Sequence, residues 1–143
     1  MTTLTKAVES ILTAQKKSGK PLAVIIAGHN GSGKSTMWYV DLADKFQFPL
    51  VNADARVSTR VANGGHNVDT DRLVERFPRT QLVIRHASNV ADATILTDNS
   101  REQKDAFTVC RVQMGDSEIY DRRKVRGKKP PAILDWMDVV CPL

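Results

Sequence analysis

Residues 22–36 read LAVIIAGHNGSGKST, and this stretch decides the fold that the sequence predicts. Its first six residues are continuously apolar and rich in β-branched side chains, which is typical of a strand buried on both faces of a parallel sheet. The glycines at 28, 31 and 33 allow the backbone to curl so that its N–H groups point inward at phosphate oxygens. An amphipathic helix is expected to follow and to add its unpaired amides and positive dipole end. A strand, a glycine-rich loop and a helix in this order predict a phosphate-binding P-loop.

The loop predicts a nucleoside triphosphate with Mg²⁺ as its ligand. Lys34 can reach the β- and γ-phosphates, and the Ser35 hydroxyl is placed to ligate Mg²⁺. The sequence has no Asn-Lys-x-Asp motif for guanine, so we expect ATP rather than GTP. The expected nucleotide-binding residues are Gly28, His29, Asn30, Gly31, Ser32, Gly33, Lys34, Ser35 and Thr36.

The composition is that of one ordinary globular domain. The chain has 143 residues, of which 41% are hydrophobic and 26% charged. No apolar run approaches the roughly 20 residues that cross a bilayer, and no signal peptide is recognisable, so we expect a cytoplasmic protein without membrane contact. Cys110 and Cys141 lie far apart in sequence with no Cys-x-x-Cys pattern, which favours two reduced thiols over a disulfide or a zinc site.

The net charge of +5 suits an anionic ligand. Much of the positive charge lies in residues 122–129, ahead of Pro130 and Pro131. No aromatic residues interleave with these cations to stack on bases. We therefore expect a solvated loop there rather than a nucleic-acid patch.

The spacing of apolar residues predicts the remaining elements. Residues 70–77 indicate a helix that Pro78 interrupts, and residues 81–91 fit either a helix or a strand. We favour a helix there, with an inward face of Leu82, Val83, Ala87 and Val90. The other predicted elements are an N-terminal helix ended by Gly19, a helix with Trp38, Leu42 and Phe46 on one face, strands over 49–54 and 93–98, a hairpin around residues 115–117, and a helix or strand over 132–140.

These elements predict an α/β fold in a single domain of residues 1–143. The expected architecture is a shortened three-layer fold of the P-loop NTPase type, with a mostly parallel sheet and a C-terminal β-hairpin. Its expected parts are an N-terminal helix (1–20), a P-loop core (21–54), a lid-like arginine segment (56–91), and a last strand, hairpin and tail (92–143).

Three further residues are candidates for catalysis. Asp54 ends the strand expected beside the P-loop, where a carboxylate can orient an acceptor hydroxyl and take its proton; a structural cap is the open alternative. Arg60 and Arg76 flank the bend at residues 64–66, so both can lie on a lid and neutralise a γ-phosphate. The alternative for both arginines is a solvent-facing position on a helix.

Several motifs together resemble the zeta toxin family of kinases. Residues 27–36 and 51–54 (VNAD) are similar to the opening of that family. Residues 60–68 (RVANGGHNV), followed by 76–79 (RFPR), are similar to its C-terminal lid segment, and residues 97–100 (TDNS) resemble its final core strand. The resemblance covers about residues 20 to 115. The Gly-Gly-His segment with its arginines is more specific than the P-loop, which many kinases share.

The resemblance implies an ATP-dependent kinase that phosphorylates a small hydroxylated molecule, with UDP-N-acetylglucosamine as the family's acceptor. It also implies Asp54 as catalytic base and Arg60 and Arg76 as γ-phosphate contacts. An antitoxin is the protein partner that the family implies.

One departure from the family changes what we expect of this chain. Only residues 55–59 separate Asp54 from Arg60, whereas the family has a long middle section there that carries central strands and much of the sugar-nucleotide pocket. We therefore expect uncovered strand edges or apolar faces. Two alternatives to a kinase stay open, namely a non-catalytic nucleotide-binding or partner-binding protein and a basic nucleic-acid-binding protein.

Overall fold

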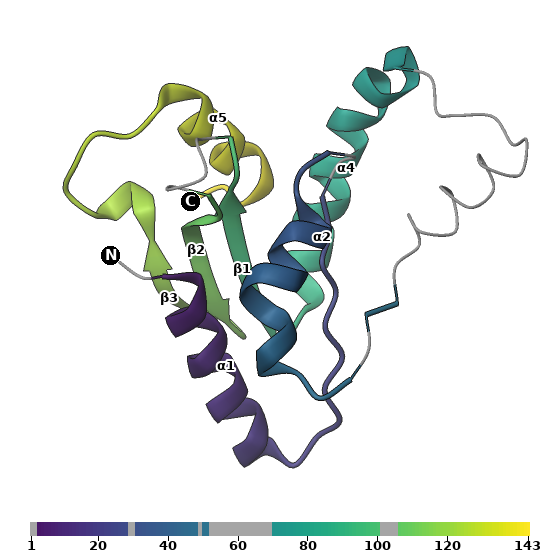
Figure 1. Cartoon of the computed structure of the whole chain (residues 1–143). Coiled ribbons are helices and arrows are strands. Elements are labelled where there is room, and N and C mark those ends of the chain that lie inside the picture. Colours follow the sequence, from purple (N-terminus) through teal and green to yellow (C-terminus); the bar gives the residue numbers. More distant parts are fainter. Residues whose placement is uncertain (1–2, 29–30, 49, 52–69, 101–105) are drawn as a thin grey trace, which may run out of the picture.

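A computed structural model of the chain describes residues 3–28, 31–48, 50–51, 70–100 and 106–143 (Figure 1). The described elements are α1 (Leu4–Ser18), α2 (Lys34–Met37), a π-helical turn η1 (Trp38–Leu42), a 3-10 turn η2 (Ala43–Lys45), α4 (Thr70–Val90), β1 (Ala93–Asp98), β2 (Thr108–Met114), β3 (Ser117–Asp121), a 3-10 turn η4 (Arg122–Lys124) and α5 (Pro131–Val140). None of the helices among these residues is long and apolar enough to cross a membrane.

The sheet has three strands in the order β1-β2-β3, and both strand pairs are antiparallel. β1 begins with Ala93 opposite Met114, and the hairpin between β2 and β3 turns at Gly115, whose φ of 54° is left-handed. The predicted strand over residues 93–98 and the predicted hairpin are both confirmed. Both were predictable because alternating patterns and turn residues are local signals.

Two hydrophobic clusters cover the two faces of this sheet. On one face α1 and η1 bring Leu4, Val8 and Trp38 against strand β2. On the other face α5 packs its own apolar residues against Cys110 and Leu96. Neighbouring strand residues point to opposite faces, so Val109 joins the first cluster and Cys110 the second.

The predicted N-terminal helix is confirmed with its end signals. The Thr3 side chain accepts a hydrogen bond from the Lys6 amide at the start of α1. Gly19 ends the helix with a left-handed φ of 66°. The predicted helix after the glycine loop is also present, but it is divided into α2, η1 and η2, and its expected face includes the buried Trp38 and Leu42.

The expected mostly parallel sheet is not observed among the described residues. Residues 22–27 form neither a helix nor a strand, and they pair with no described strand. Ile25 is 87% exposed and Val24 39%, whereas Ile26 packs against the α1 side of the core. An apolar run predicts burial only where neighbouring strands supply a sheet, and no described strand flanks this one. The predicted strand over 49–54 lies mostly outside the described residues.

The predicted helix over 81–91 is confirmed as the second half of α4, although two details are corrected. Pro78 does not end the helix, because α4 runs through it from Thr70 to Val90. The predicted inward face is wrong, since Ile84 packs against the α5 side of the core and Ser88 is buried instead. The residues of the predicted face are all exposed: Leu82, Val83, Ala87 and Val90. No described layer covers that side of the helix.

Candidate phosphate-binding site

The glycine-rich loop has the conformation that its glycines make accessible. Gly31 and Gly33 adopt φ of 79° and 86°, in the left-handed region that other residues rarely enter. Helix α2 begins directly afterwards at Lys34, and the Met37 amide donates to the Gly33 carbonyl oxygen over 2.8 Å. The loop therefore passes straight into helical structure, as the sequence predicts.

The Lys34 side chain is folded back across this loop. Its Nζ donates a hydrogen bond to the carbonyl oxygen of Gly28 over 3.2 Å, and the residue is half-buried. The ammonium is thus held beside the loop backbone rather than extended into solvent. Phosphate oxygens entering the loop would meet this charge at short range.

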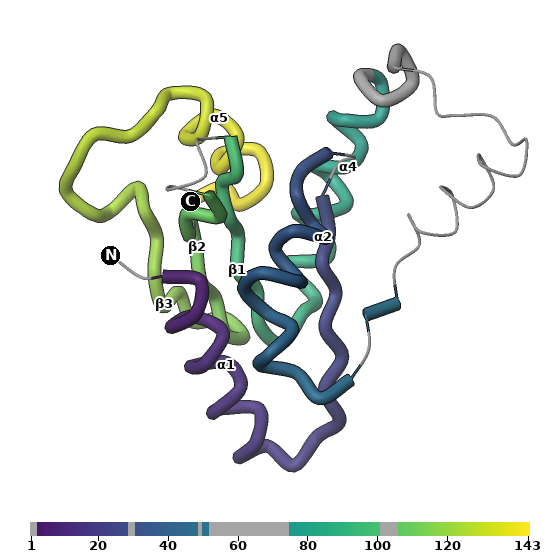
Figure 2. The backbone as a smooth tube through the Cα atoms, viewed as in Figure 1, coloured from purple at the N-terminus to yellow at the C-terminus, as the bar shows by residue number. Residues whose placement is uncertain are grey.

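An open hollow of about 340 Å³ lies between this loop and helix α4. Residues 26–28 and Lys34 form one wall, and Figure 2 shows the tube of the chain before the loop running alongside α2 and α4. The α4 wall consists of Arg76, Arg79, Thr80, Val83 and Ile84. Cations thus come from both walls, and none of the described lining residues is acidic. Arg76 and Arg79 are exposed, so their charges face solvent at this hollow. Such a hollow attracts an anion.

The structure brings together some of the predicted site residues. Gly28, residues 31–36 and Arg76 lie at the hollow or in the loop beside it. His29 and Asn30 of the loop, and the predicted catalytic residues Asp54 and Arg60, lie outside the described residues.

Sequence reasoning gave no role to Arg79, although it lines the hollow with Arg76. The available signal was its spacing, because residues three apart on a helix share one face. What the sequence could not show is that this face of α4 is turned toward the loop.

The residues at the loop fit a magnesium ion that arrives with phosphates. Ser35 follows Lys34 at the start of α2 and offers a hard hydroxyl oxygen, of the kind that Mg²⁺ prefers. Among the described residues no group of His, Cys, Asp and Glu is arranged to hold a metal ion by itself. Mg²⁺ commonly keeps waters and substrate phosphates as most of its ligands, so a single hydroxyl is consistent with such a site.

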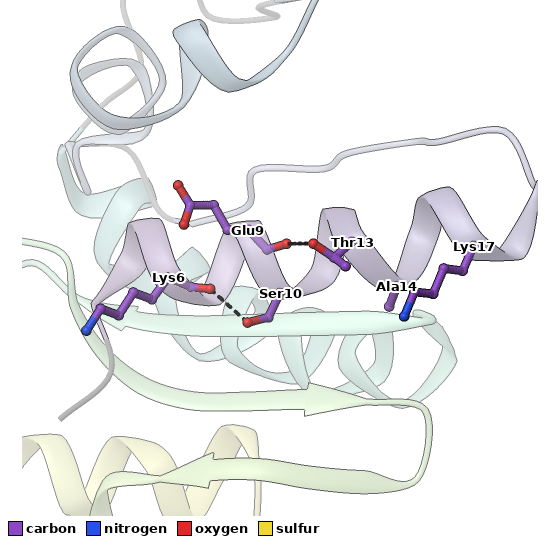
Figure 3. Close-up of a pocket in the computed structure, with 6 residues that line it drawn as sticks. All are labelled: Lys6, Glu9, Ser10, Thr13, Ala14 and Lys17. Atoms are coloured by element: carbon purple, nitrogen blue, oxygen red, sulfur yellow. Dashed lines mark hydrogen bonds between the residues drawn. The ribbon is translucent and has the colours of Figure 1, made fainter.

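A larger hollow of about 640 Å³ lies along the outside of α1 (Figure 3). Its lining comes from that one helix: Lys6, Glu9, Ser10, Thr13, Ala14 and Lys17. The Ser10 and Thr13 hydroxyls donate to the carbonyl oxygens of Lys6 and Glu9, four residues earlier in each case. Because its charges are of mixed sign and its hydroxyls are engaged, this surface offers no comparable ligand chemistry.

A charge network centred on the buried Asp121 carboxylate ties the end of β3 to α5. Arg123 pairs with Asp121 over 2.6 Å and with Asp138 over 2.8 Å, and it donates to the Cys141 carbonyl oxygen. Burial by itself would raise the pKa of Asp121, but the hydrogen bonds and charge of Arg123, helped by Arg111, hold that pKa below its usual value. The expectation of a solvated loop over residues 122–129 is therefore corrected at its start, because Arg122 is buried and Arg123 is half-buried.

The two cysteines are free thiols, and Cys110 is fully buried. Burial raises the pKa of the Cys110 thiol to about 11, and burial also raises the pKa of Cys141. Neither thiol is therefore activated as a nucleophile.

Comparisons of the chain with known protein families, with curated proteins and with solved structures found no match. The zeta toxin resemblance therefore stays a prediction from its motifs.

Proposed function

We propose that this chain binds ATP with Mg²⁺, with the phosphates in the glycine-rich loop and their outer charges between Lys34 and helix α4. The observation that carries the proposal is the hollow that Lys34 of the loop lines together with Arg76 and Arg79. A triphosphate carries several negative oxygens, and cations from two elements around a partly apolar hollow suit it better than a neutral ligand.

Each residue has a distinct role in this proposal. The loop glycines let backbone N–H groups approach the phosphates, and Lys34 neutralises the β- and γ-phosphates. Ser35 would hold Mg²⁺, which when bound neutralises charge on the same oxygens. Arg76 and Arg79 contact the outer phosphates from the α4 side.

We further propose that the activity is transfer of the γ-phosphate to a small hydroxylated acceptor such as UDP-N-acetylglucosamine. The family resemblance implies that Asp54 takes the proton of the acceptor hydroxyl and that Arg60 is a second γ-phosphate contact. The presence of Arg76 at the same hollow as Lys34 supports this proposal, because a transferring phosphoryl group spreads negative charge that additional cations stabilise.

A nucleotide-binding protein without kinase activity is the second candidate. It is favoured by the exposure of Val24 and Ile25, at the place where further strands of a kinase core would pack. The family's acceptor contacts belong to the section that this sequence lacks. Because a well-oriented acceptor is worth as much as about 7–11 kcal/mol of the barrier, we expect slow sugar-nucleotide phosphorylation.

The experiment has two arms on the purified chain. Isothermal titration with ATP and Mg²⁺ tests binding, with AMP as the comparison ligand that lacks the outer phosphates. Incubation with γ-labelled ATP and UDP-N-acetylglucosamine tests transfer. Binding of ATP well above AMP supports the first proposal, and equal or absent binding refutes it. ATP binding without labelled sugar nucleotide selects the second candidate over the kinase.

A further inference from the structure

Asn99 links the end of strand β1 to the phosphate-binding loop. Its Nδ2 donates a hydrogen bond to the carbonyl oxygen of Ser32 over 3.0 Å, between residues 67 positions apart in sequence. Asn99 follows directly after the last residue of β1, so the sheet and the loop meet at this bond.

The turn that carries Asn99 is itself fixed. The buried Asp98 side chain accepts hydrogen bonds from the Ser100 amide over 2.8 Å and from the Ser100 hydroxyl over 2.6 Å. Asp98 also lies 3.7 Å from the Arg122 guanidinium, which comes from the turn after β3. Asn99 therefore projects from a turn that is anchored on both sides.

The hydrogen bond to Ser32 sets the direction of the next amide. A trans peptide unit is planar, with its C=O and N–H pointing in opposite directions. Because the Ser32 carbonyl points toward Asn99, the Gly33 N–H points away from it. That N–H belongs to the segment proposed to wrap the phosphates, immediately before Lys34.

The same contact crowds the position of a side chain at Gly33. A Cβ atom there would overlap the Asn99 amide nitrogen and would lie 3.2 Å from the ring of Phe107, so both neighbours would have to shift. The loop therefore lies against Asn99 and Phe107 at Gly33. By contrast, a Cβ on Gly31 would meet nothing within 4 Å.

We propose that Asn99 is a positioning residue that holds the Ser32–Gly33 peptide in its phosphate-binding orientation before a nucleotide arrives. The inference rests on the proposed function, since it assigns Asn99 a part in ATP binding at that loop. A loop that is already ordered loses less conformational freedom when the ligand binds, so its affinity is higher.

The test compares Asn99→Leu with Asn89→Leu, a matched control at an exposed asparagine of α4. Leu is similar in size to Asn but has no donor. We expect Asn99→Leu to weaken Mg·ATP binding about five-fold, the factor that corresponds to one net hydrogen bond. Asn99→Gln, which keeps the amide on a longer side chain, should recover part of the affinity. In the nucleotide-free chain, the backbone amide NMR signals of Ser32 and Gly33 should shift or broaden in Asn99→Leu but not in Asn89→Leu, because the peptide between them loses its fixed orientation.

The outcomes separate this inference from the function on which it rests. If the parent binds Mg·ATP and Asn99→Leu binds equally well, the inference is overturned and the proposed function stands. If the parent does not bind Mg·ATP, both the proposed function and the inference are refuted. Lower thermal stability with unchanged affinity would show a purely structural role and also overturn it. Asn99→Ala provides a second removal of the donor if the Leu side chain disturbs Phe107.

Discussion

The Lys34 ammonium donates a hydrogen bond over 3.2 Å to the carbonyl oxygen of Gly28, which lies six residues earlier across the glycine-rich loop. The cation is therefore held at the loop by the protein's own backbone. The loop also directs it toward the hollow that it shares with Arg76 and Arg79. Predictions about this site test whether that arrangement of charges binds phosphates.

Replacing Lys34 by Ala should weaken Mg·ATP binding at least tenfold, because a hydrogen bond to a charged group is worth about 1.5–3 kcal/mol. Titration calorimetry measures the change. Lys45→Ala is the matched control, since Lys45 follows in the same helical region but pairs with Glu9 over 2.8 Å. Equal ATP affinity in the parent and Lys34→Ala would contradict the assignment of the loop.

Removing either arginine of α4 should weaken ATP binding more than AMP binding, because these residues are proposed to meet the outer phosphates. We expect Arg76→Gln and Arg79→Gln each to reduce ATP affinity about three- to tenfold. This range covers ion pairs from fully exposed to partly removed from water. Arg85→Gln is the control, because Arg85 is exposed on the same helix and does not line the hollow. An equal loss for ATP and AMP would place the arginines away from the outer phosphates.

Replacing Gly33 by Ala should lower the free energy of unfolding more than replacing Gly31 by Ala. Both glycines have left-handed φ, so each substitution costs about 1–2 kcal/mol in backbone strain. Only at Gly33 does the new Cβ also collide with Asn99 and Phe107. Urea unfolding of the two variants isolates the collision as the difference between them. Equal stabilities would show that the loop does not rest on Asn99 as described.

Local signals in the sequence predicted the elements that local interactions form. Gly19 ends α1 and Gly115 turns the hairpin, and each does so through its own backbone conformation. The apolar run over 22–27 predicted a buried strand, but burial depends on partners that a run of residues does not specify. At the candidate site, the glycine-rich motif predicted a loop that runs into a helix with Lys34 at its start. The Asn99–Ser32 contact was not predictable, because nothing local joins residues 67 positions apart.

The stability of the fold should depend on the Asp121 carboxylate at acidic pH. A carboxylate whose pKa is lower in the folded than in the unfolded chain stabilises the fold above its unfolded pKa, and this contribution disappears as the pH falls through the folded pKa. Because the pKa of Asp121 is lowered from 3.8, we expect the free energy of unfolding to decrease as the pH falls below about 5.

The Asp121→Asn variant tests this dependence by urea unfolding between neutral and acidic pH. It should be less stable at neutral pH by on the order of 3 kcal/mol, because the change removes one charge of a buried pair. Its stability should then vary less with pH than that of the parent. Asp116→Asn, at an exposed residue of the β2–β3 turn, should follow the parent throughout. A parallel pH profile in Asp121→Asn and the parent would contradict the assignment.

The neighbouring residues Ile25 and Ile26 should respond in opposite ways to the same substitution. Ile25 is 87% exposed, so Ile25→Thr removes an apolar surface without removing a core contact. We expect it to leave the free energy of unfolding unchanged within about 0.5 kcal/mol, as is usual for surface changes. It should also lower the binding of a hydrophobic dye and any concentration-dependent association.

Ile26 packs against the α1 side of the core, so Ile26→Thr should destabilise the chain by about 1 kcal/mol, part of the value of a fully buried side chain. Urea unfolding, dye fluorescence and light scattering measure the three effects. If Ile25→Thr were the more destabilising change, residues 22–27 would be packed in solution as a sheet strand, and the parallel core that the sequence predicts would form after all.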